Sequence, residues 1–249
     1  MSAGTDSSRE WFRNWFGEEY LELYPHRDEA EAGRAVRLYL KAMGRPTGPV
    51  LDLACGAGRH LRELVDAQVD AVGLDLSGVL LAEARRASPT HRLVRADMRE
   101  LPFEDGAFGG LTSFFTSFGY FRTREEDRRV VREVRRVLQV GGTFMLDFFN
   151  AARVRDELVP RDERRIGDRL VSQTREIVGD TVVKRIRIRR FPDEAPVREF
   201  EERVRLYDEE ELRALLAEEG LATMEEFGNY GGDPYGPSAE RLILVGAAA

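Results

Sequence analysis

The 249-residue sequence has one cysteine and no long apolar run. The single Cys55 cannot pair within the chain, so a disulfide-stabilised fold is excluded. The longest apolar runs, such as residues 144–146, are far shorter than the ~20 residues that a membrane-spanning helix needs. The first residues contain neither the basic nor the apolar part of a secretion signal. We therefore expect a cytoplasmic protein with no membrane segment.

The sequence also has no excess of positive charge. The 45 acidic residues outnumber the 38 basic ones, which gives a formal net charge of −7 at pH 7. Because a negative field repels phosphate backbones, nucleic acid is an unlikely partner by this criterion. The histidines at positions 26, 60 and 91 have no metal-ligand spacing, so no metal is predicted. The 42% of hydrophobic residues are enough for a sizeable core.

Between residues 50 and 150, short apolar segments alternate with amphipathic ones. This pattern is typical of βαβ units and predicts an α/β fold with a doubly wound, mostly parallel sheet. Helices should begin near Arg59 and at a cap formed by Ser77. Five strands are predicted at about residues 50–54, 70–76, 93–96, 111–115 and 143–149.

Capping boxes mark two later helices, because each has a polar residue followed three positions later by a glutamate. Thr123 with Glu126 begins the first, which we expect to stop at Gly141-Gly142. The second begins at Asp208, and two strands are predicted after it, at 221–227 and 241–245.

The sequence changes character after about residue 160. Val178-Gly179-Asp180-Thr181 has the composition of a two-residue hairpin turn, and about three antiparallel strands are predicted around it. One face of this insert would carry a solvated charge ladder rather than an RNA-binding surface. The residues of the ladder are Arg185, Arg187 and Arg189 on one strand and Glu199 and Glu201 on the next.

The strongest motif is a strand that runs into a glycine turn and a helix, at residues 50–60. Glycine lets the backbone bend tightly and approach a ligand, while the helix N-terminus offers free N–H groups. Asp75 ends the next strand, where a carboxylate can accept both hydroxyls of a ribose. A nucleotide-type ligand is implied. Leu61 stands where a dinucleotide fingerprint has its third glycine, which disfavours an NAD-dependent enzyme.

Four motifs in order resemble the class I S-adenosylmethionine-dependent methyltransferases. They are Asp-x-Ala-Cys-Gly-x-Gly at 52–58, Gly-Leu-Asp-Leu-Ser at 73–77, Ala-Asp-Met at 96–98 and Leu-Pro-Phe at 101–103. The final helix and two strands fit the closing antiparallel hairpin of that family. Residues 113–120 resemble the deoxyamino-sugar N-methyltransferases, which carry a β cap where this chain has its insert. The resemblance implies a Rossmann-like sheet. It also implies direct transfer of a methyl group from S-adenosylmethionine to a nitrogen or oxygen atom of a small-molecule acceptor.

The resemblance also implies roles for individual residues. Asp75 would hold the ribose of the cofactor and Leu76 would flank its adenine. Asp97 and the backbone N–H of Met98 would bind the adenine, and Tyr24 would help to cover the cofactor. The residues placed around the methionine part and the sulfonium are Asp52, Ala54, Cys55, Gly56, Gly58, Phe114 and Phe115.

Methyl transfer from a sulfonium depends on alignment and exclusion of water, and a dedicated base is optional. Residues near predicted strand ends, or in the loop over the site, are candidates to orient the acceptor: Tyr120, Asp147, Asn150 and Tyr230. The alternatives are a methyltransferase that acts on RNA or protein and an inactive cofactor-binding protein.

Three parts of the chain are distinguished by this interpretation. Residues 1–45 would form a helical lid segment, and residues 46–160 with 208–249 the methyltransferase domain. Residues 161–207 would form the cap, or else the arm of a homodimer. The apolar residues expected to face the domain are Ile186, Ile188, Phe200 and Val204.

Overall fold

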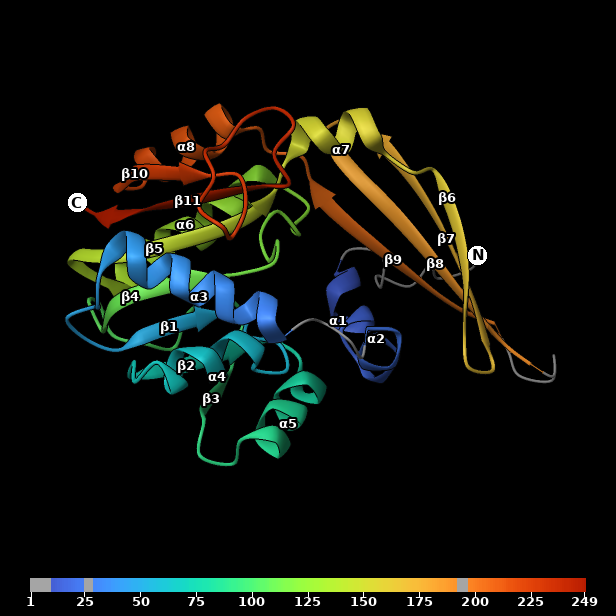
Figure 1. Cartoon of the computed structure of the whole chain (residues 1–249), viewed down its shortest axis with the longest axis horizontal. Helices are drawn as coiled ribbons and strands as arrows, with labels where there is room; N and C mark the ends of the chain where they lie inside the picture. Colours follow the sequence, from blue (N-terminus) through green and yellow to red (C-terminus); the bar gives the residue numbers. More distant parts are fainter. Residues whose placement is uncertain (1–9, 25–28, 192–196) are drawn as a thin grey trace, which may run out of the picture.

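The computed structural model describes residues 10–24, 29–191 and 197–249, which contain two sheets (Figure 1). The strands of the first sheet are β1 (Val50–Leu53), β2 (Ala71–Asp75), β3 (Arg92–Arg95), β4 (Phe108–Ser113), β5 (Leu138–Phe149), β10 (Leu221–Phe227) and β11 (Arg241–Ala248). They lie in the order β10-β11-β5-β4-β1-β2-β3. Strands β1 to β5 pair in parallel, whereas β11 is antiparallel to both β5 and β10. The predicted fold class, with its closing antiparallel hairpin, is confirmed.

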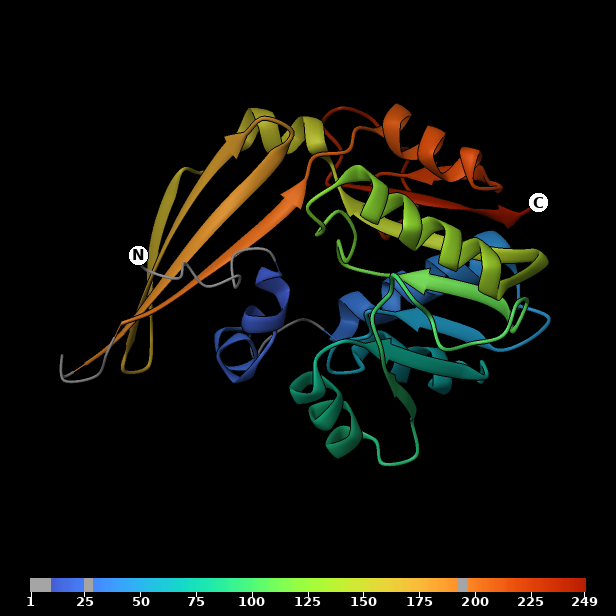
Figure 2. The same ribbon diagram turned by 180° about the vertical axis from the view of Figure 1, so that it is seen from behind.

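Helices cover both faces of this sheet (Figures 1 and 2). One face carries α3 (Glu29–Met43) and α4 (Arg59–Asp66), and the opposite face carries α6 (Arg124–Val137) and α8 (Glu209–Glu218). Both predicted capping boxes are present at the N-termini of α6 and α8. The side chain of Ser77 caps α5 (Gly78–Ala87) as expected. No helix of the described part of the chain combines the length and apolarity needed to cross a membrane.

Two element boundaries beside glycine pairs differ from the prediction. Helix α6 ends at Val137 rather than at Gly141-Gly142, and these glycines lie in β5, where the pairing with β4 shifts register. Strand β4 starts at Phe108, three residues earlier than predicted. A Cβ on Gly109 would lie 2.5 Å from a backbone nitrogen of the segment that enters β1, so glycine is required for this close approach.

The second sheet is antiparallel and has four strands instead of about three. They are β6 (Arg161–Ile166), β7 (Arg169–Val178), β8 (Thr181–Arg190) and β9 (Arg198–Arg205), in that order. Strand β6 was missed because its sequence, RDERRI, is a charged edge strand without the alternation that identifies a half-buried one. The two-residue hairpin between β7 and β8 is confirmed.

The charge ladder is present on the second sheet. Arg185 pairs with Glu201 at 3.1 Å and Arg187 with Glu199 at 2.7 Å. All four residues are on the two strands that the sequence assigned to them, β8 and β9. These pairs stabilise little because they are exposed.

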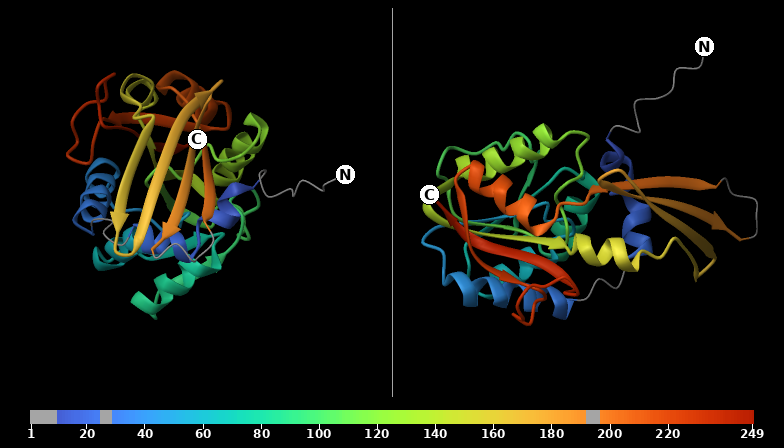
Figure 3. Two further views of the ribbon diagram at one scale, coloured as in Figure 1. Left: turned by 90° about the vertical axis from the view of Figure 1, so that its right-hand side faces the viewer. Right: turned by 90° about the horizontal axis from the view of Figure 1, so that it is seen from above.

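Helices α1 (Trp11–Trp15) and α2 (Glu18–Leu23) lie beside the second sheet, on the side toward the first (Figure 3). The completely buried Trp15 has its ring 4.9 Å from that of Phe200 in β9. The apolar face of the second sheet therefore packs partly on α1 rather than directly on the parallel sheet. Residues 1–9 and 25–28 of the predicted helical segment lie outside the described residues. A short helix, α7 (Ala151–Glu157), leads from β5 into the second sheet.

Candidate active site

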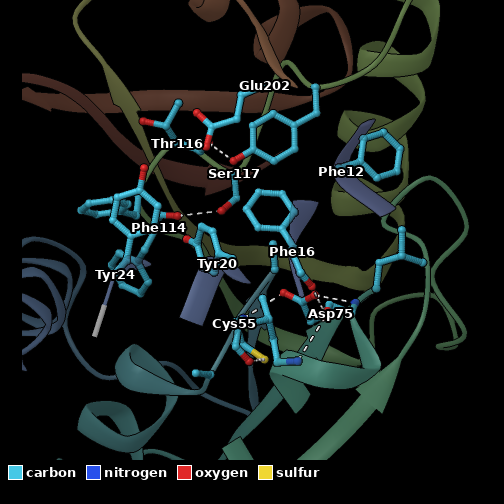
Figure 4. Close-up of a pocket in the computed structure, with 18 of the residues that line it drawn as sticks. Phe12, Phe16, Tyr20, Tyr24, Cys55, Asp75, Phe114, Thr116, Ser117 and Glu202 are labelled. Atoms are coloured by element: carbon cyan, nitrogen blue, oxygen red, sulfur yellow. Dashed lines mark hydrogen bonds between the residues drawn. The ribbon is translucent and has the colours of Figure 1, made fainter. Parts of the chain in front are cut away.

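A cavity of about 1610 Å³ lies at the carboxyl ends of the parallel strands. Its walls come from the loops after β1 to β4, from α1 and α2, and from strands β7, β8 and β9 of the second sheet. Figure 4 shows Cys55 and Asp75 at one end of the cavity and Glu202 and Thr116 toward the other. The cavity therefore lies between the two sheets and is lined by both.

Ten of the twelve predicted cofactor residues line this cavity. They are Tyr24, Ala54, Cys55, Gly56, Asp75, Leu76, Asp97, Met98, Phe114 and Phe115. Asp52 and Gly58 are not part of the lining. The structure thus brings together residues from the ends of four strands, as the resemblance implied. Their contact with a cofactor remains a prediction.

The carboxylate of Asp75 supports the glycine turn. Its two oxygens accept hydrogen bonds from the backbone N–H of Gly56, at 2.9 Å, and of Ser77, at 2.8 Å. Burial raises the pKa of Asp75, while these backbone donors oppose the shift. Each carboxylate oxygen can accept a second hydrogen bond, so both remain able to bind a ribose hydroxyl.

Cys55 and Leu61 pack tightly against β2. A Cβ on Gly73 would lie 2.7 Å from a methyl of Leu61 and 2.8 Å from Sγ of Cys55. The leucine at the place of the third fingerprint glycine therefore fills the space between α4 and β2. Burial raises the pKa of the Cys55 thiol well above its usual value, which suits a packing role better than a nucleophilic one.

Ala54 has a left-handed backbone, with φ of 58°, in a turn where Gly56 and Gly58 also have positive φ. Because a Cβ disfavours this conformation, we expect Ala54→Gly to raise the free energy of unfolding by about 0.5 kcal/mol, the strain relieved less the entropy that glycine adds to the unfolded chain. Urea denaturation measures the change. Ala57→Gly in the same turn is the control, since Ala57 does not have positive φ and glycine there should destabilise. A loss of stability in Ala54→Gly would contradict the strain.

Asp52 is a completely buried carboxyl group beneath the turn. One oxygen accepts a hydrogen bond from the Thr112 hydroxyl at 3.3 Å, and the other has no hydrogen-bond partner. Burial raises the pKa of Asp52 to about 7, and the negative charge of Asp75 adds to the shift. Asp52 therefore titrates near neutral pH.

This raised pKa makes the stability of the protein depend on pH. The folded-state pKa of Asp52 lies above the unfolded value, so its contribution is present at low pH and is lost as pH rises through about 7. We expect the wild type to lose about 1 kcal/mol of unfolding free energy between pH 6 and pH 8 relative to Asp52→Asn. Urea denaturation at several pH values tests this. Parallel pH profiles for the two proteins would contradict the raised pKa.

Asp97 belongs to an ion-pair network at the mouth of the cavity. Arg99 binds Asp97 at 2.7 Å, Glu10 at 2.7 Å and Glu126 at 2.8 Å. Burial opposes ionisation of Asp97, but the hydrogen bonds from Arg99 lower its pKa overall. The network connects the loop after β3, the segment before α1 and the first turn of α6. Asp97 therefore has a structural role, and binding of adenine would be a second one.

Of the four residues predicted to orient an acceptor, one lines the cavity and three do not. Tyr120 lines the cavity and its hydroxyl donates a 2.6 Å hydrogen bond to the carbonyl of Thr116. Asp147, Asn150 and Tyr230 are outside the lining. The amide of Asn150 caps α7 and binds carbonyls of the loop at residues 236–239. Proximity to a strand end or to the loop over the sheet does not determine whether a side chain faces the cavity, and the role of these residues toward an acceptor stays a prediction.

Many residues of the cavity wall were not predicted from the sequence, and His60, Lys184 and Glu202 are three of them. His60 stacks on Phe114 with ring centroids 4.2 Å apart, and its place in the first turn of α4 was a usable signal. Lys184 and Glu202 are cross-strand neighbours, 3.2 Å apart, that also line the cavity. Both lie on the face of the insert that carries Ile186 and Phe200, and a charged pair on an apolar face was the signal available there.

No group of three histidine, cysteine, aspartate or glutamate side chains within residues 10–24, 29–191 and 197–249 is arranged to hold a metal ion. The absence of a metal stays a prediction.

Comparison with known proteins gives a consistent picture. Residues 50–142 match a family described as a methyltransferase domain. A dTDP-3-amino-3,4,6-trideoxy-alpha-D-glucopyranose N,N-dimethyltransferase of Streptomyces venezuelae is 34% identical over 124 residues, which are 47% of this chain and 52% of that protein. A demethylmenaquinone methyltransferase of Beutenbergia cavernae is 37% identical over 115 residues, 46% of each protein. The chain thus spans about half the length of the curated relatives it matches.

Solved structures extend the likeness to most of the chain. The sugar N-methyltransferase KedS8 of a Streptoalloteichus species is 26% identical and superposes with a TM-score of 0.72, with 93% of both chains covered. The likeness therefore includes the second sheet as well as the parallel one.

Proposed function

We propose that this chain is a class I S-adenosylmethionine-dependent methyltransferase that methylates a small molecule, with nitrogen as the favoured acceptor atom. Residues 46–160 with 208–249 would form the catalytic domain and residues 161–207 a cap. The amino-sugar N-methyltransferases among the similar proteins support this choice of acceptor.

The size and lining of the cavity carry the proposal. Sites for one drug-sized ligand usually occupy about 300–1,000 Å³, and this cavity of about 1610 Å³ is larger. The turn held by Asp75 would take the cofactor, which leaves the part lined by the second sheet for a second molecule. That part combines polar and apolar side chains, namely Arg175, Val182, Lys184, Glu202 and Val204.

The residues of this chain fit S-adenosylmethionine at the Asp75 end. Gly56 and Gly58 have no side chain in the turn, and Asp75 offers acceptors for ribose hydroxyls. The cofactor supplies an electrophilic methyl group. The protein would contribute alignment and a dry environment, since the aromatic rings of Phe16, Tyr20 and Phe114 line the middle of the cavity (Figure 4).

A macromolecular acceptor is disfavoured by the shape of the site. Helices α1 and α2 and the second sheet form part of the cavity wall, so the proposed site is a cavity between segments of this chain, which suits a small molecule better than a folded RNA or protein. The net charge of −7 also opposes RNA.

Calorimetry with S-adenosylhomocysteine, followed by transfer assays with methyl-labelled S-adenosylmethionine, tests the proposal. We expect binding of S-adenosylhomocysteine but not of NAD, and label in small amines such as amino-sugar nucleotides. Demethylmenaquinone analogues, total tRNA and a protein extract are the competing acceptors. Label in tRNA or protein alone would contradict the small-molecule acceptor, and micromolar NAD binding would contradict the cofactor.

A further inference from the structure

Two adjacent residues of the cavity wall have an uncommon backbone conformation. Phe115 and Thr116 both have φ of 60°, in the left-handed region that favours glycine. This conformation is most unfavourable for a β-branched residue such as threonine. Both residues line the cavity, in the loop that follows β4. Such a pair persists only where surrounding contacts hold it in place.

A buried cluster behind the wall supplies those contacts. The carboxylate of Asp147, at the end of β5, accepts a 2.6 Å hydrogen bond from the N–H of Phe115. The backbone carbonyl of Asp147 accepts a 2.9 Å hydrogen bond from the N–H of Thr116. Arg241, the first residue of β11, forms an ion pair with Asp147 and donates a 3.2 Å hydrogen bond to the Thr116 hydroxyl. The hydroxyl of Tyr230 also donates to Asp147.

We infer that Asp147, Arg241 and Tyr230 are positioning residues that hold Phe115 and Thr116 in the left-handed conformation and thereby fix the wall where donor and acceptor meet. The inference rests on the proposed function. The guanidinium of Arg241 also lies 5.2 Å from the centre of the Phe115 ring, so one side chain fixes both residues of the turn. The carbonyl of Thr116 in turn orients Tyr120.

Substitution of Tyr230 tests the cluster without removing a charge. Tyr230→Phe should lower kcat about tenfold, while the KM of the acceptor and the Kd of S-adenosylhomocysteine change by less than about threefold, because alignment and not binding is lost. The matched control is Tyr39→Phe, which removes another buried phenol hydrogen bond, to Thr143 at 2.8 Å, away from the cavity. Its kcat should stay within about twofold of the wild type. Equal kcat values for Tyr230→Phe and the wild type would overturn the inference.

An NMR measurement tests the same cluster without any turnover. In protein labelled with ¹⁵N-phenylalanine, the amide of Phe115, assigned by its loss in Phe115→Leu, should be shifted downfield and exchange slowly because it donates to a buried carboxylate. Asp147→Asn combined with Arg241→Gln leaves no unpaired buried charge and should move this signal upfield and speed its exchange. An unmoved signal overturns the inference even if the chain transfers methyl. Failure of the wild type to bind S-adenosylhomocysteine overturns the proposed function instead.

Discussion

Replacing Asp75 with alanine is expected to weaken S-adenosylhomocysteine binding about 100-fold, or about 3 kcal/mol, in a protein that remains folded. Two effects add. The carboxylate acceptors for the ribose hydroxyls are lost, which accounts for most of the loss because a hydrogen bond to a charged group contributes about 1.5 to 3 kcal/mol. The N–H groups of Gly56 and Ser77 also lose their acceptor, so the turn that receives the cofactor loses its support.

Isothermal titration calorimetry measures this loss, and two further variants separate its causes. Asp75→Asn keeps one acceptor oxygen and should bind better than Asp75→Ala but worse than the wild type. The control is Asp70→Ala, which removes an exposed carboxylate just before β2. Its affinity for S-adenosylhomocysteine should stay within about threefold of the wild type. A folded Asp75→Ala protein with unchanged affinity would remove Asp75 from the site.

Replacing Arg205 with methionine is expected to lower the free energy of unfolding by about 3 to 5 kcal/mol, because it leaves a buried carboxylate without its cation. Arg205 binds Asp127 of α6 at 3.0 Å and Asp180 of the β7–β8 turn at 2.8 Å. Its guanidinium also donates to the carbonyls of Phe121 and Arg122. These contacts join the second sheet to the parallel-sheet part of the chain.

Urea denaturation at pH 5 and pH 8 tests both the size and the cause of this effect. Burial raises the pKa of Asp127 to about 6, so the carboxyl is largely neutral at pH 5 and the loss should be smaller there than at pH 8. The control is Arg187→Met, which breaks an exposed pair with Glu199 and should cost less than about 1 kcal/mol. Equal losses for the two substitutions would contradict the role of burial.

Several parts of the site could be predicted because their signals are local. The strand, glycine turn and helix at residues 50–66 follow from a composition that allows few other conformations. Ser77 and the two capping boxes mark helix starts through hydrogen bonds that span three residues. Local signals failed where an element depends on its neighbours, as in the charged edge strand β6 and in the glycines of β4 and β5.

The sequence by itself determined the α/β class, the glycine turn and the helix caps, because alternating strands and helices and their caps leave short, periodic patterns in the sequence. Only the tertiary structure decided which side chains face the cavity. Asp147 and Tyr230 lie behind Phe115, whereas Lys184 and Glu202 reach the cavity from the second sheet. The physical reason is that these positions depend on packing between segments far apart in the sequence, such as Trp15 on Phe200, which no local pattern contains.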